Sequence, residues 1–347
     1  MNAWMSPWLH AIAFAVGAGL LTWLLLPALI DWLRQRAMLD MPNERSSHVI
    51  PTPRGGGIAV VAAILAMGLP WLTLQGGGLA LPQAGLPGLL LAGALALALL
   101  SWFDDRLRGL PVSLRLGGQA LAVLLVLSLL PAEARAVPQP LQDWLPLWLE
   151  RLLCFLAWLW FTNLFNFMDG IDGISGVEMA GIGIGLAACY GLAGFGLVPA
   201  GLALIVAASG LAFLRSNWSP AKVFMGDVGS VPVGFLLGGL LLQAALSGLW
   251  AAALILPLYY WFDATVTLCK RLLRGEKIWR AHRQHFYQQG SRKNGSHAPV
   301  ALKIAALNAL LVVLALAAQL GPKPWGELAA LGLGLLLTLL LCRHFSE

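Results

Sequence analysis

Eleven apolar stretches of close to membrane-spanning length occur in this chain of 347 residues. A transmembrane helix needs about 20 consecutive apolar residues. Because the stretches are continuous and do not alternate with polar residues, they predict helices rather than the strands of a membrane barrel. Only 11% of the residues are charged, against about 25% in soluble domains. The sequence therefore predicts an all-α, polytopic integral membrane protein that forms a single transmembrane domain over residues 1–347. Spans are expected at 8–30, 56–74, 86–102, 116–131, 147–165, 174–194, 197–214, 229–247, 249–268, 300–319 and 326–342.

Lysine and arginine are distributed unevenly between the segments that join these spans. With Lys303 at the foot of the tenth span included, 19 of the 22 basic residues fall in alternate segments, and the exceptions are Arg135, Arg151 and Lys323. Because cytoplasmic loops are enriched in Lys and Arg, the N-terminus is predicted to be periplasmic and the C-terminus cytoplasmic. The net charge of +6 then reflects topology, and no nucleic-acid-binding motif accompanies it. The predicted cytoplasmic loops are 31–55, 103–115, 166–173, 215–228 and 269–299.

Acidic residues of these loops stand next to the ends of predicted spans. The stretch WFDDRLRG places Asp104 and Asp105 after the third span. NFMDGIDG places Asp169 and Asp172 after the fifth span, and VFMGDVGS places Asp227 before the eighth. Carboxylates at span ends can simply face water, but five on one membrane face need a cation or a proton to offset their repulsion. This concentration of acids favours a functional site on the cytoplasmic side.

The donor atoms in this acidic centre indicate which cation it would bind. Oxygen ligands without cysteine or clustered histidine select Mg²⁺, with Mn²⁺ as the alternative, rather than Zn²⁺. Mg²⁺ commonly uses one or two carboxylates together with substrate phosphates, so the acids need not all be ligands. The cysteines show no metal-ligand spacing and are expected to be small core residues: Cys154, Cys189, Cys269 and Cys342.

Basic residues in the same loops are typical of a phosphate-binding site. Mg²⁺ carboxylates surrounded by Arg and Lys suit phosphate or pyrophosphate chemistry. The glycine-rich stretch PTPRGGG, at the entry of the second span, could hold an anion on its backbone N–H groups or simply break the chain before the span. His282 and His285 are candidates for catalysis or phosphate contact, and the alternative is that they are surface residues. The candidate basic residues are Arg54, Arg106, Lys222 and Arg283.

These motifs, in this order over residues 40–290, resemble those of the polyprenyl-phosphate N-acetylhexosamine-1-phosphate transferases. That superfamily includes the enzymes that initiate O-antigen, enterobacterial common antigen and teichoic acid synthesis, and the muramyl-pentapeptide translocase. The resemblance implies transfer of a sugar 1-phosphate from a UDP-N-acetylhexosamine to undecaprenyl phosphate, with release of UMP. It also implies a multi-pass protein of the bacterial inner membrane, surrounded by bilayer lipids, with its site on the cytoplasmic face and a homodimer as a common assembly.

The resemblance assigns expected roles to individual residues. Asp227 would be the direct Mg²⁺ ligand, with Asp104 as a second ligand. Asp104 and Asp105 would form a catalytic acidic pair, one of which takes the proton from the lipid phosphate. Asp169 and Asp172 are further catalytic candidates: Asp169 would help to hold the acidic centre, and Asp172 would help to line the uridine and diphosphate pocket. His285 would lie near the diphosphate, Phe224 would stack on uracil, and Arg54, Lys222 and Arg283 would contact substrate. The remaining residues expected to line the uridine and diphosphate pocket are Asn166, Gly170, Ile171 and Asn217.

Two other functions remain open at this stage. The stretch HRQHFYQQ carries only the first histidine of the family's clustered histidine motif, and His282 lies outside that motif. PTPRGGG resembles the N-acetylhexosamine enzymes more than the muramyl-pentapeptide translocase, which is the first alternative. The second is a cation-coupled secondary transporter, for which Glu178 and Asp263 inside predicted spans would be the key acids. The identity of the sugar is not determined by these residues.

Overall fold

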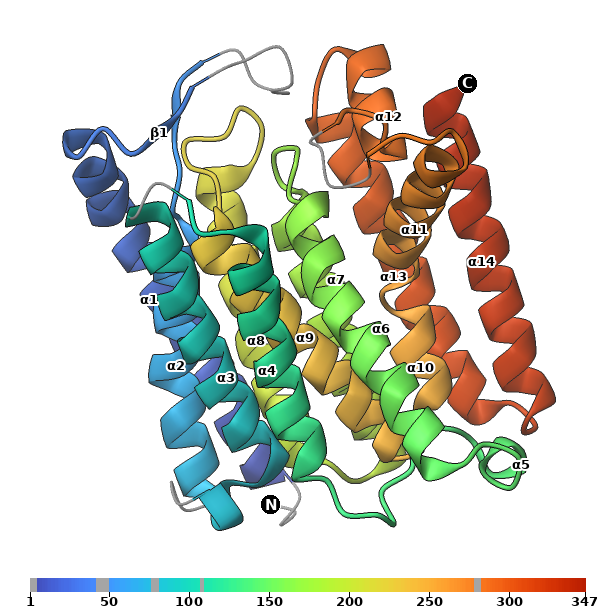
Figure 1. Ribbon diagram of the computed structural model, residues 1–347. Coiled ribbons are helices and arrows are strands. Elements are labelled where there is room, and N and C mark those ends of the chain that lie inside the picture. Colours follow the sequence, from blue (N-terminus) through green and yellow to red (C-terminus); the bar gives the residue numbers. More distant parts are fainter. Residues whose placement is uncertain (1–4, 42–49, 76–80, 107–108, 278–281) are drawn as a thin grey trace.

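The computed structural model describes residues 5–41, 50–75, 81–106, 109–277 and 282–347, and these fold into a bundle of helices (Figure 1). Parts of three predicted loops, at 42–49, 107–108 and 278–281, lie outside the described residues. The helices are α1 (Met5–Gln35), α2 (Gly57–Leu74), α3 (Leu81–Arg106), α4 (Val112–Ser128), α5 (Gln139–Gln142), α6 (Leu147–Met168), α7 (Ile174–Ala193), α8 (Leu197–Asn217), α9 (Asp227–Leu246), α10 (Trp250–Ile255), α11 (Leu258–Leu273), α12 (Phe286–Asn294), α13 (Ala298–Leu320) and α14 (Trp325–Ser346). Two short strands, β1 (Leu39–Asp40) and β2 (Thr52–Pro53), pair antiparallel.

Within the described ranges, nine helices are long and apolar enough to cross a membrane: α1, α2, α3, α6, α7, α8, α9, α13 and α14. Helices suit a bilayer because each satisfies its own backbone hydrogen bonds. The predicted all-α, polytopic membrane protein is thereby confirmed. The predicted span at 116–131 corresponds to α4, which has only 17 residues, and the span at 249–268 is divided between α10 and α11. The total of eleven spans therefore stays a prediction.

The interior of the bundle is centred on α9, the most buried of these nine helices. α9 packs against α3 and α6, and α8 packs against α1 and α7. At Gly238 a Cβ atom would lie 2.5 Å from the ring of Trp158, and the Trp158 indole donates a hydrogen bond to the carbonyl of Phe235 at 2.8 Å. In a membrane the hydrophobic effect does not drive helices together, because lipid chains are as apolar as the side chains. Small residues such as glycine instead let two helices approach closely and pack. These contacts fix the position of α6, which ends at the candidate site, relative to α9, which begins there.

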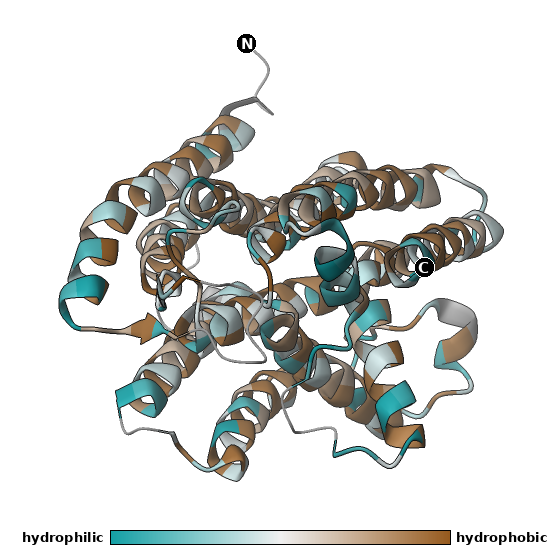
Figure 2. Ribbon diagram, turned by 90° about the horizontal axis from the view of Figure 1, so that it is seen from above, coloured by the Kyte–Doolittle hydropathy of each residue, from teal (hydrophilic) through white to brown (hydrophobic). Residues whose placement is uncertain are grey.

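Many large hydrophobic side chains are exposed on the outside of the bundle. The ribbon seen from above and coloured by hydropathy shows hydrophobic residues along most of its helices (Figure 2). On α1 alone, Leu9, Ile12, Val16 and Leu20 are at least half exposed. In water such a surface would be unstable, whereas lipid chains solvate it. The prediction of buried cysteines holds for Cys189 and Cys342 and is wrong for Cys269. Cys269 is exposed because it lies beside Lys270 on the outward side of the last turns of α11.

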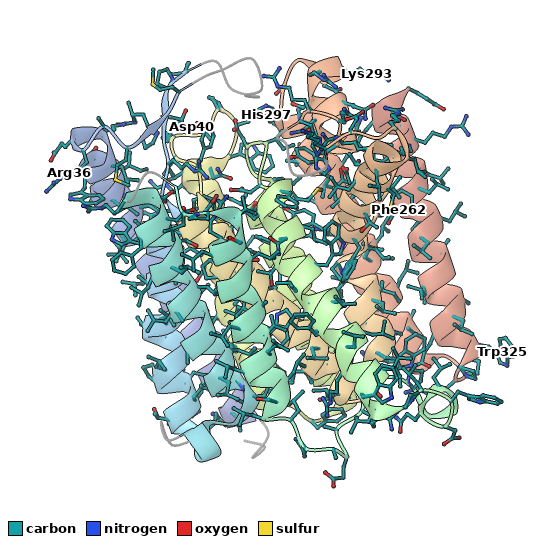
Figure 3. The ribbon with its side chains drawn as sticks, viewed as in Figure 1. Arg36, Asp40, Phe262, Lys293, His297 and Trp325 are labelled. Atoms are coloured by element: carbon teal, nitrogen blue, oxygen red, sulfur yellow. The ribbon has the colours of Figure 1, made fainter. Side chains whose placement is uncertain are left out.

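The described parts of the predicted cytoplasmic loops lie at one end of the bundle (Figure 1). β1, α12 and the loops before α7 and α9 all lie at this end (Figure 1). Arg36, Asp40, Lys293 and His297 lie there as well, and Trp325 lies at the opposite end (Figure 3). This shared location agrees with the prediction that alternate loops, which are rich in Lys and Arg, lie on the same side of the membrane. Which side of the membrane this end faces stays a prediction.

Candidate active site

The glycine-rich stretch after β2 pairs with the loop that precedes α9. Arg54 forms a parallel bridge with Phe224, and the N–H groups of Gly55 and Gly56 donate to the Phe224 carbonyl at 3.1 and 2.8 Å. The Gly57 N–H donates to Met225 at 2.9 Å, and a Cβ atom on Gly57 would lie 2.2 Å from the Cα atom of Gly229. Of the two alternatives for this stretch, the anion site is the one that the structure contradicts, because these N–H groups donate to backbone carbonyls of the chain itself. Their role is to place Arg54 beside the start of α9.

Within the predicted acidic centre, two arginines pair with two of the aspartates, Asp104 and Asp227. Arg54 Nη2 donates to Asp227 Oδ1 at 2.6 Å. Arg115 Nη1 lies 3.2 Å from Asp104 Oδ2 and 3.8 Å from Asp227 Oδ2, so one guanidinium nitrogen serves both carboxylates. Burial lowers the pKa of Arg54, but Asp227, Asp105 and Asp40 more than offset it and raise that pKa above its ordinary value. Arg115 was not predicted as a site residue because its only signal was its place in the loop 103–115.

The donors at this centre fit a Mg²⁺ ion. Asp104 and Asp227 offer oxygen ligands, and both already face one shared cation, Arg115. Among the described residues, no three His, Cys, Asp or Glu side chains converge as a ready cage. Mg²⁺ does not require one, since it keeps waters and completes its shell with substrate phosphates. Mg²⁺ dependence stays a prediction, with these two aspartates as the expected ligands.

The loop between α6 and α7 is held by its own polar residues. Gly173, whose φ of 83° favours glycine, precedes α7 and donates its N–H to Asn217 Oδ1 at 2.9 Å. Asn217 Nδ2 donates in turn to the Val223 carbonyl at 3.0 Å. Asn217, predicted to bind substrate, is buried and joins two loops of the site. Ile171 is also buried, whereas Asn166 is half-buried on the last turn of α6.

Asp263 organises the histidine loop. Its Oδ1 accepts hydrogen bonds from His285 Nδ1 and from the N–H of Phe286, each at 3.0 Å, and its Oδ2 accepts one from the N–H of Tyr287 at 3.0 Å. The Tyr287 hydroxyl then donates to the Phe167 carbonyl at 3.2 Å, and Gly170 packs against that hydroxyl. Asp263 thus ties the start of α12 to the loop after α6. The remaining donors to Asp263 are the hydroxyls of Tyr259 and Thr267.

The two histidines of this loop are less accessible than expected. The side chain of His285 is only 3% exposed, and its ring stacks between those of His282 and Tyr287 at centroid distances of 4.8 and 5.5 Å. Burial, together with the neighbouring His285 and Arg271, lowers the pKa of His282 to about 4, so His282 is neutral at pH 7. Glu178, the other acid considered for a transporter, is buried and accepts a hydrogen bond from Asn308 at 2.8 Å.

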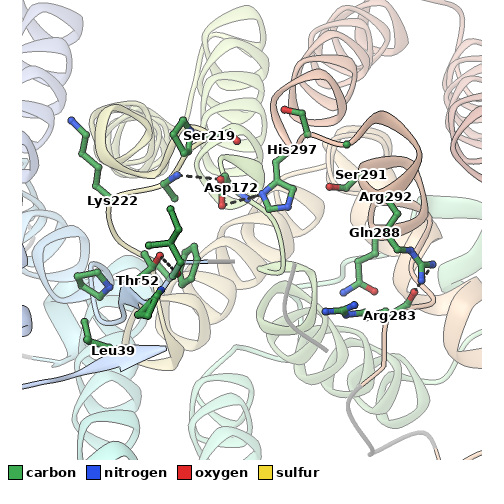
Figure 4. Close-up of a pocket in the computed structure, with 18 of the residues that line it drawn as sticks. Leu39, Thr52, Asp172, Ser219, Lys222, Arg283, Gln288, Ser291, Arg292 and His297 are labelled. Carbon is green, nitrogen blue, oxygen red and sulfur yellow. Dashed lines mark hydrogen bonds and ion pairs between the residues drawn. The ribbon is translucent and has the colours of Figure 1, made fainter. Parts of the chain in front are cut away.

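A cavity of about 900 Å³ opens at the same end of the bundle (Figure 4). Four predicted site residues line it: Asp172, Lys222, Phe224 and Arg283. Arg34, Arg292 and His297 also line it and carried no recognised motif. Lys222 lies on one wall, and Arg283, Gln288 and Arg292 lie on the opposite wall, contributed by α12 and the loop before it (Figure 4). Cations and the planar ring of Phe224 therefore line the cavity, which suits an anionic ligand with a planar group.

Asp169 provides a pH-dependent test of the acidic centre. Burial raises its pKa from 3.8 to about 6, although the Ser175 hydroxyl donates to its Oδ1 at 2.6 Å. The folded protein therefore binds a proton between about pH 4 and pH 6 that the unfolded chain releases, and ionisation above pH 6 costs stability. We expect Asp169→Asn, which keeps an acceptor for Ser175, to raise Tm more at pH 8 than at pH 4. Thermal unfolding in detergent at both pH values measures this, and a pH-independent difference would contradict it.

Comparison with known proteins identifies relatives of this chain. A family model described as glycosyl transferase family 4 matches residues 88–245. A probable undecaprenyl-phosphate N-acetylglucosaminyl 1-phosphate transferase of Bacillus subtilis (strain 168) is 27% identical over 248 residues, which are 68% of this chain and 65% of that protein. A decaprenyl-phosphate N-acetylglucosaminephosphotransferase of Mycobacterium leprae (strain TN) is 30% identical over 292 residues, which are 74% of this chain and 71% of that protein.

A third relative belongs to the alternative reaction class. A phospho-N-acetylmuramoyl-pentapeptide-transferase of Moorella thermoacetica (strain ATCC 39073 / JCM 9320) is 35% identical over 156 residues, 41% of this chain and 48% of that protein. The chain thus spans about half to two thirds of the length of the Moorella and Bacillus proteins that it matches. The match to the Mycobacterium leprae protein covers more than two thirds of both chains. By this similarity and by the family model, the chain belongs to glycosyl transferase family 4, the superfamily of polyprenyl-phosphate N-acetylhexosamine-1-phosphate transferases.

Proposed function

We propose that the protein transfers an N-acetylhexosamine 1-phosphate, GlcNAc or a related deoxy-amino sugar, from a UDP-sugar to undecaprenyl phosphate and releases UMP. The observation that carries the proposal is a cation-lined cavity close to a cluster of carboxylates, at one end of a membrane-spanning bundle. A lipid phosphate has its tail in the bilayer and its head in water, so it reaches such a site without leaving the membrane. We further propose that this end is cytoplasmic and that the membrane is the bacterial inner membrane.

The residues divide the work of this reaction. An oxygen of the lipid phosphate attacks the β-phosphorus of the UDP-sugar, and the bond to the bridging oxygen breaks as UMP leaves. In the cavity, Lys222 and Arg283 offset the charge of the diphosphate, and the Phe224 ring stacks on the base. Such positioning of two phosphates supplies much of the catalysis in phosphoryl transfer. Asp227 and Asp104 would hold Mg²⁺, which neutralises the diphosphate.

Asp104 and Asp105 lie in different environments, and we use this difference to assign them different roles, metal binding and proton removal. Asp104 is buried, and its oxygens accept from the N–H of Leu110 and from Arg115. Asp105 is exposed and lies in the field of Arg54, Asp227 and Asp104. We assign the removal of the proton from the lipid phosphate to Asp105, because its carboxylate is the more accessible of the two.

An assay with purified protein in detergent tests the proposal. The protein is incubated with Mg²⁺, undecaprenyl phosphate and a panel of radiolabelled UDP-sugars, which includes UDP-GlcNAc, UDP-GalNAc, and deoxy-amino sugars. We expect UMP release that depends on the lipid acceptor, stops on chelation of the metal and returns with Mg²⁺ or Mn²⁺. Absence of UMP release with every N-acetylhexosamine donor would refute the proposal.

A second candidate is transfer of phospho-N-acetylmuramoyl-pentapeptide, which the similarity to the Moorella protein favours. The corresponding UDP-muramyl-pentapeptide therefore belongs in the donor panel, and its exclusive use would replace the first proposal. Under the first proposal, the product initiates lipid-linked O-antigen or another surface polysaccharide. A homodimer is part of the proposal and is measured by light scattering in detergent.

A further inference from the structure

His297 and Asp172 form a hydrogen-bonded pair on the wall of the cavity (Figure 4). His297 immediately precedes α13 and its Nδ1 lies 3.1 Å from Asp172 Oδ1. The N–H of Ala221 donates to the other oxygen, Oδ2, at 3.1 Å. One carboxylate thus joins the loop after α6, the loop before α9 and the start of α13. Its two oxygens are already used by the protein, so Asp172 serves best as a group that orients its neighbours.

The tautomer of His297 follows from these contacts. Burial raises the pKa of Asp172, but hydrogen bonds from His297, Ala221 and Ser219 more than offset it and hold the pKa below its usual value. Asp172 is therefore ionised at pH 7. The N–H of Asp172 also points to His297 Nδ1, at 3.3 Å, but an ionised carboxylate at 3.1 Å is the stronger partner. Nδ1 therefore carries the hydrogen, and in the neutral ring Nε2 is an acceptor.

Nε2 is the nitrogen of the His297 ring that can contact a ligand in the cavity. The side chain of His297 is 11% exposed and lines the cavity, and its polar contacts with the described residues all involve Nδ1. Lys222, Arg283 and Arg292 on the walls suit the phosphates of a ligand, whereas the acceptor that Nε2 offers in the Nδ1–H tautomer suits a hydrogen-bond donor. A nucleoside offers such groups, namely the ribose hydroxyls and the imide N–H of uracil.

We propose that His297 is a nucleoside-binding residue, whose Nε2 accepts a hydrogen bond from an O–H or N–H group of the bound uridine nucleotide while Asp172 fixes its tautomer. This inference rests on the proposed function, because it needs a uridine nucleotide in the cavity. It assigns Asp172 to positioning rather than to catalysis. It also explains why a histidine outside the clustered histidine motif lies in the cavity wall.

Two substitutions separate ligand binding from structural support. His297→Asn keeps an N–H group near the position of Nδ1, and so keeps the contact with Asp172, but removes the edge that carries Nε2. His297→Gln places an amide near the position of Nε2 and loses the contact at Nδ1. Titration calorimetry with UMP, on purified protein in detergent, is expected to show about tenfold weaker binding for His297→Asn. His297→Gln is expected to bind UMP more tightly than His297→Asn.

The opposite order would overturn the inference. If His297 only supports Asp172, His297→Asn binds UMP like the wild type and His297→Gln binds it weakly. Equal binding by all three proteins would also overturn it. Thermal unfolding of each variant checks that the cavity is intact. If the wild type binds UMP and His297→Asn does not weaken it, the inference fails alone; if the wild type neither binds UMP nor releases it, the proposed function fails as well.

Three nucleotide analogues identify the donor. If the 2′-hydroxyl is the donor, 2′-deoxy-UMP binds the wild type and His297→Asn equally, and 3′-deoxy-UMP does so if the donor is the 3′-hydroxyl. If the imide N–H is the donor, N3-methyl-UMP binds both proteins equally. Any one of these results supports the inference. If His297→Asn binds all three analogues about tenfold more weakly than the wild type does, the assignment of Nε2 as an acceptor for these groups is overturned.

Discussion

Asp227→Asn is expected to lower the rate of UMP release by about 100-fold or more while the protein stays folded. Asparagine keeps an oxygen that accepts the hydrogen bond from Arg54, which the wild type makes at 2.6 Å, so the start of α9 keeps its anchor. It removes the negative charge that Asp227 contributes beside Asp104 and Arg115. The loss would therefore come from the acidic centre and not from the fold. The measurement is kcat in the detergent assay, with Tm recorded for each preparation.

Asp143→Asn is the matched control for this substitution. Asp143 is exposed next to α5, at the end of the bundle away from the cavity (Figure 1). The same chemical change there is expected to leave both kcat and Tm at the wild-type values. Wild-type turnover by Asp227→Asn would remove Asp227 from the predicted metal site, and a large drop in its Tm would assign it a structural role instead.

Asp263→Asn is expected to destabilise the protein and to reduce turnover. The N–H of Phe286 donates to Oδ1 and the N–H of Tyr287 donates to Oδ2, so either orientation of an asparagine amide turns an NH₂ group toward a backbone N–H. A buried polar group left without a partner costs about 1–3 kcal/mol, and the change affects at least two donors of the five. We therefore expect a loss of about 2–6 kcal/mol in unfolding free energy.

The consequence for activity follows from what Asp263 holds. His285 and the start of α12 would lose their anchor, and α12 contributes Gln288, Ser291 and Arg292 to the cavity. Thermal unfolding and UMP release are measured on the same preparations, with Asp143→Asn again as the reference. An unchanged Tm would mean that the hydrogen bonds to Asp263 contribute little. A cation relay is a poor description of Asp263, because these protein donors surround its carboxylate.

The pattern of apolar residues along the chain was sufficient to predict the helices of the fold, but not all of their ends. A run of apolar residues predicts a helix because every backbone group in lipid must be satisfied within the segment. The helices α6, α7 and α9 follow the predicted spans closely. The ninth predicted span is divided into α10 and α11 at Leu256 and Pro257. Proline has no backbone N–H to donate within a helix, and hydropathy alone does not register this break.

For the site, the sequence by itself determined which chemistry is present and at which end of the bundle it lies. Aspartates, arginines and glycines cluster in the loops at the same ends of the predicted spans. Four of the predicted residues, Asp172, Lys222, Phe224 and Arg283, line one cavity. Only the tertiary structure decided the partners. Arg54 meets Asp227 across 173 positions of the chain and Asp172 meets His297 across 125. Such contacts arise from helix packing rather than from local spacing, so no motif reveals that His297 lies in the cavity or that Asp263 holds the histidine loop.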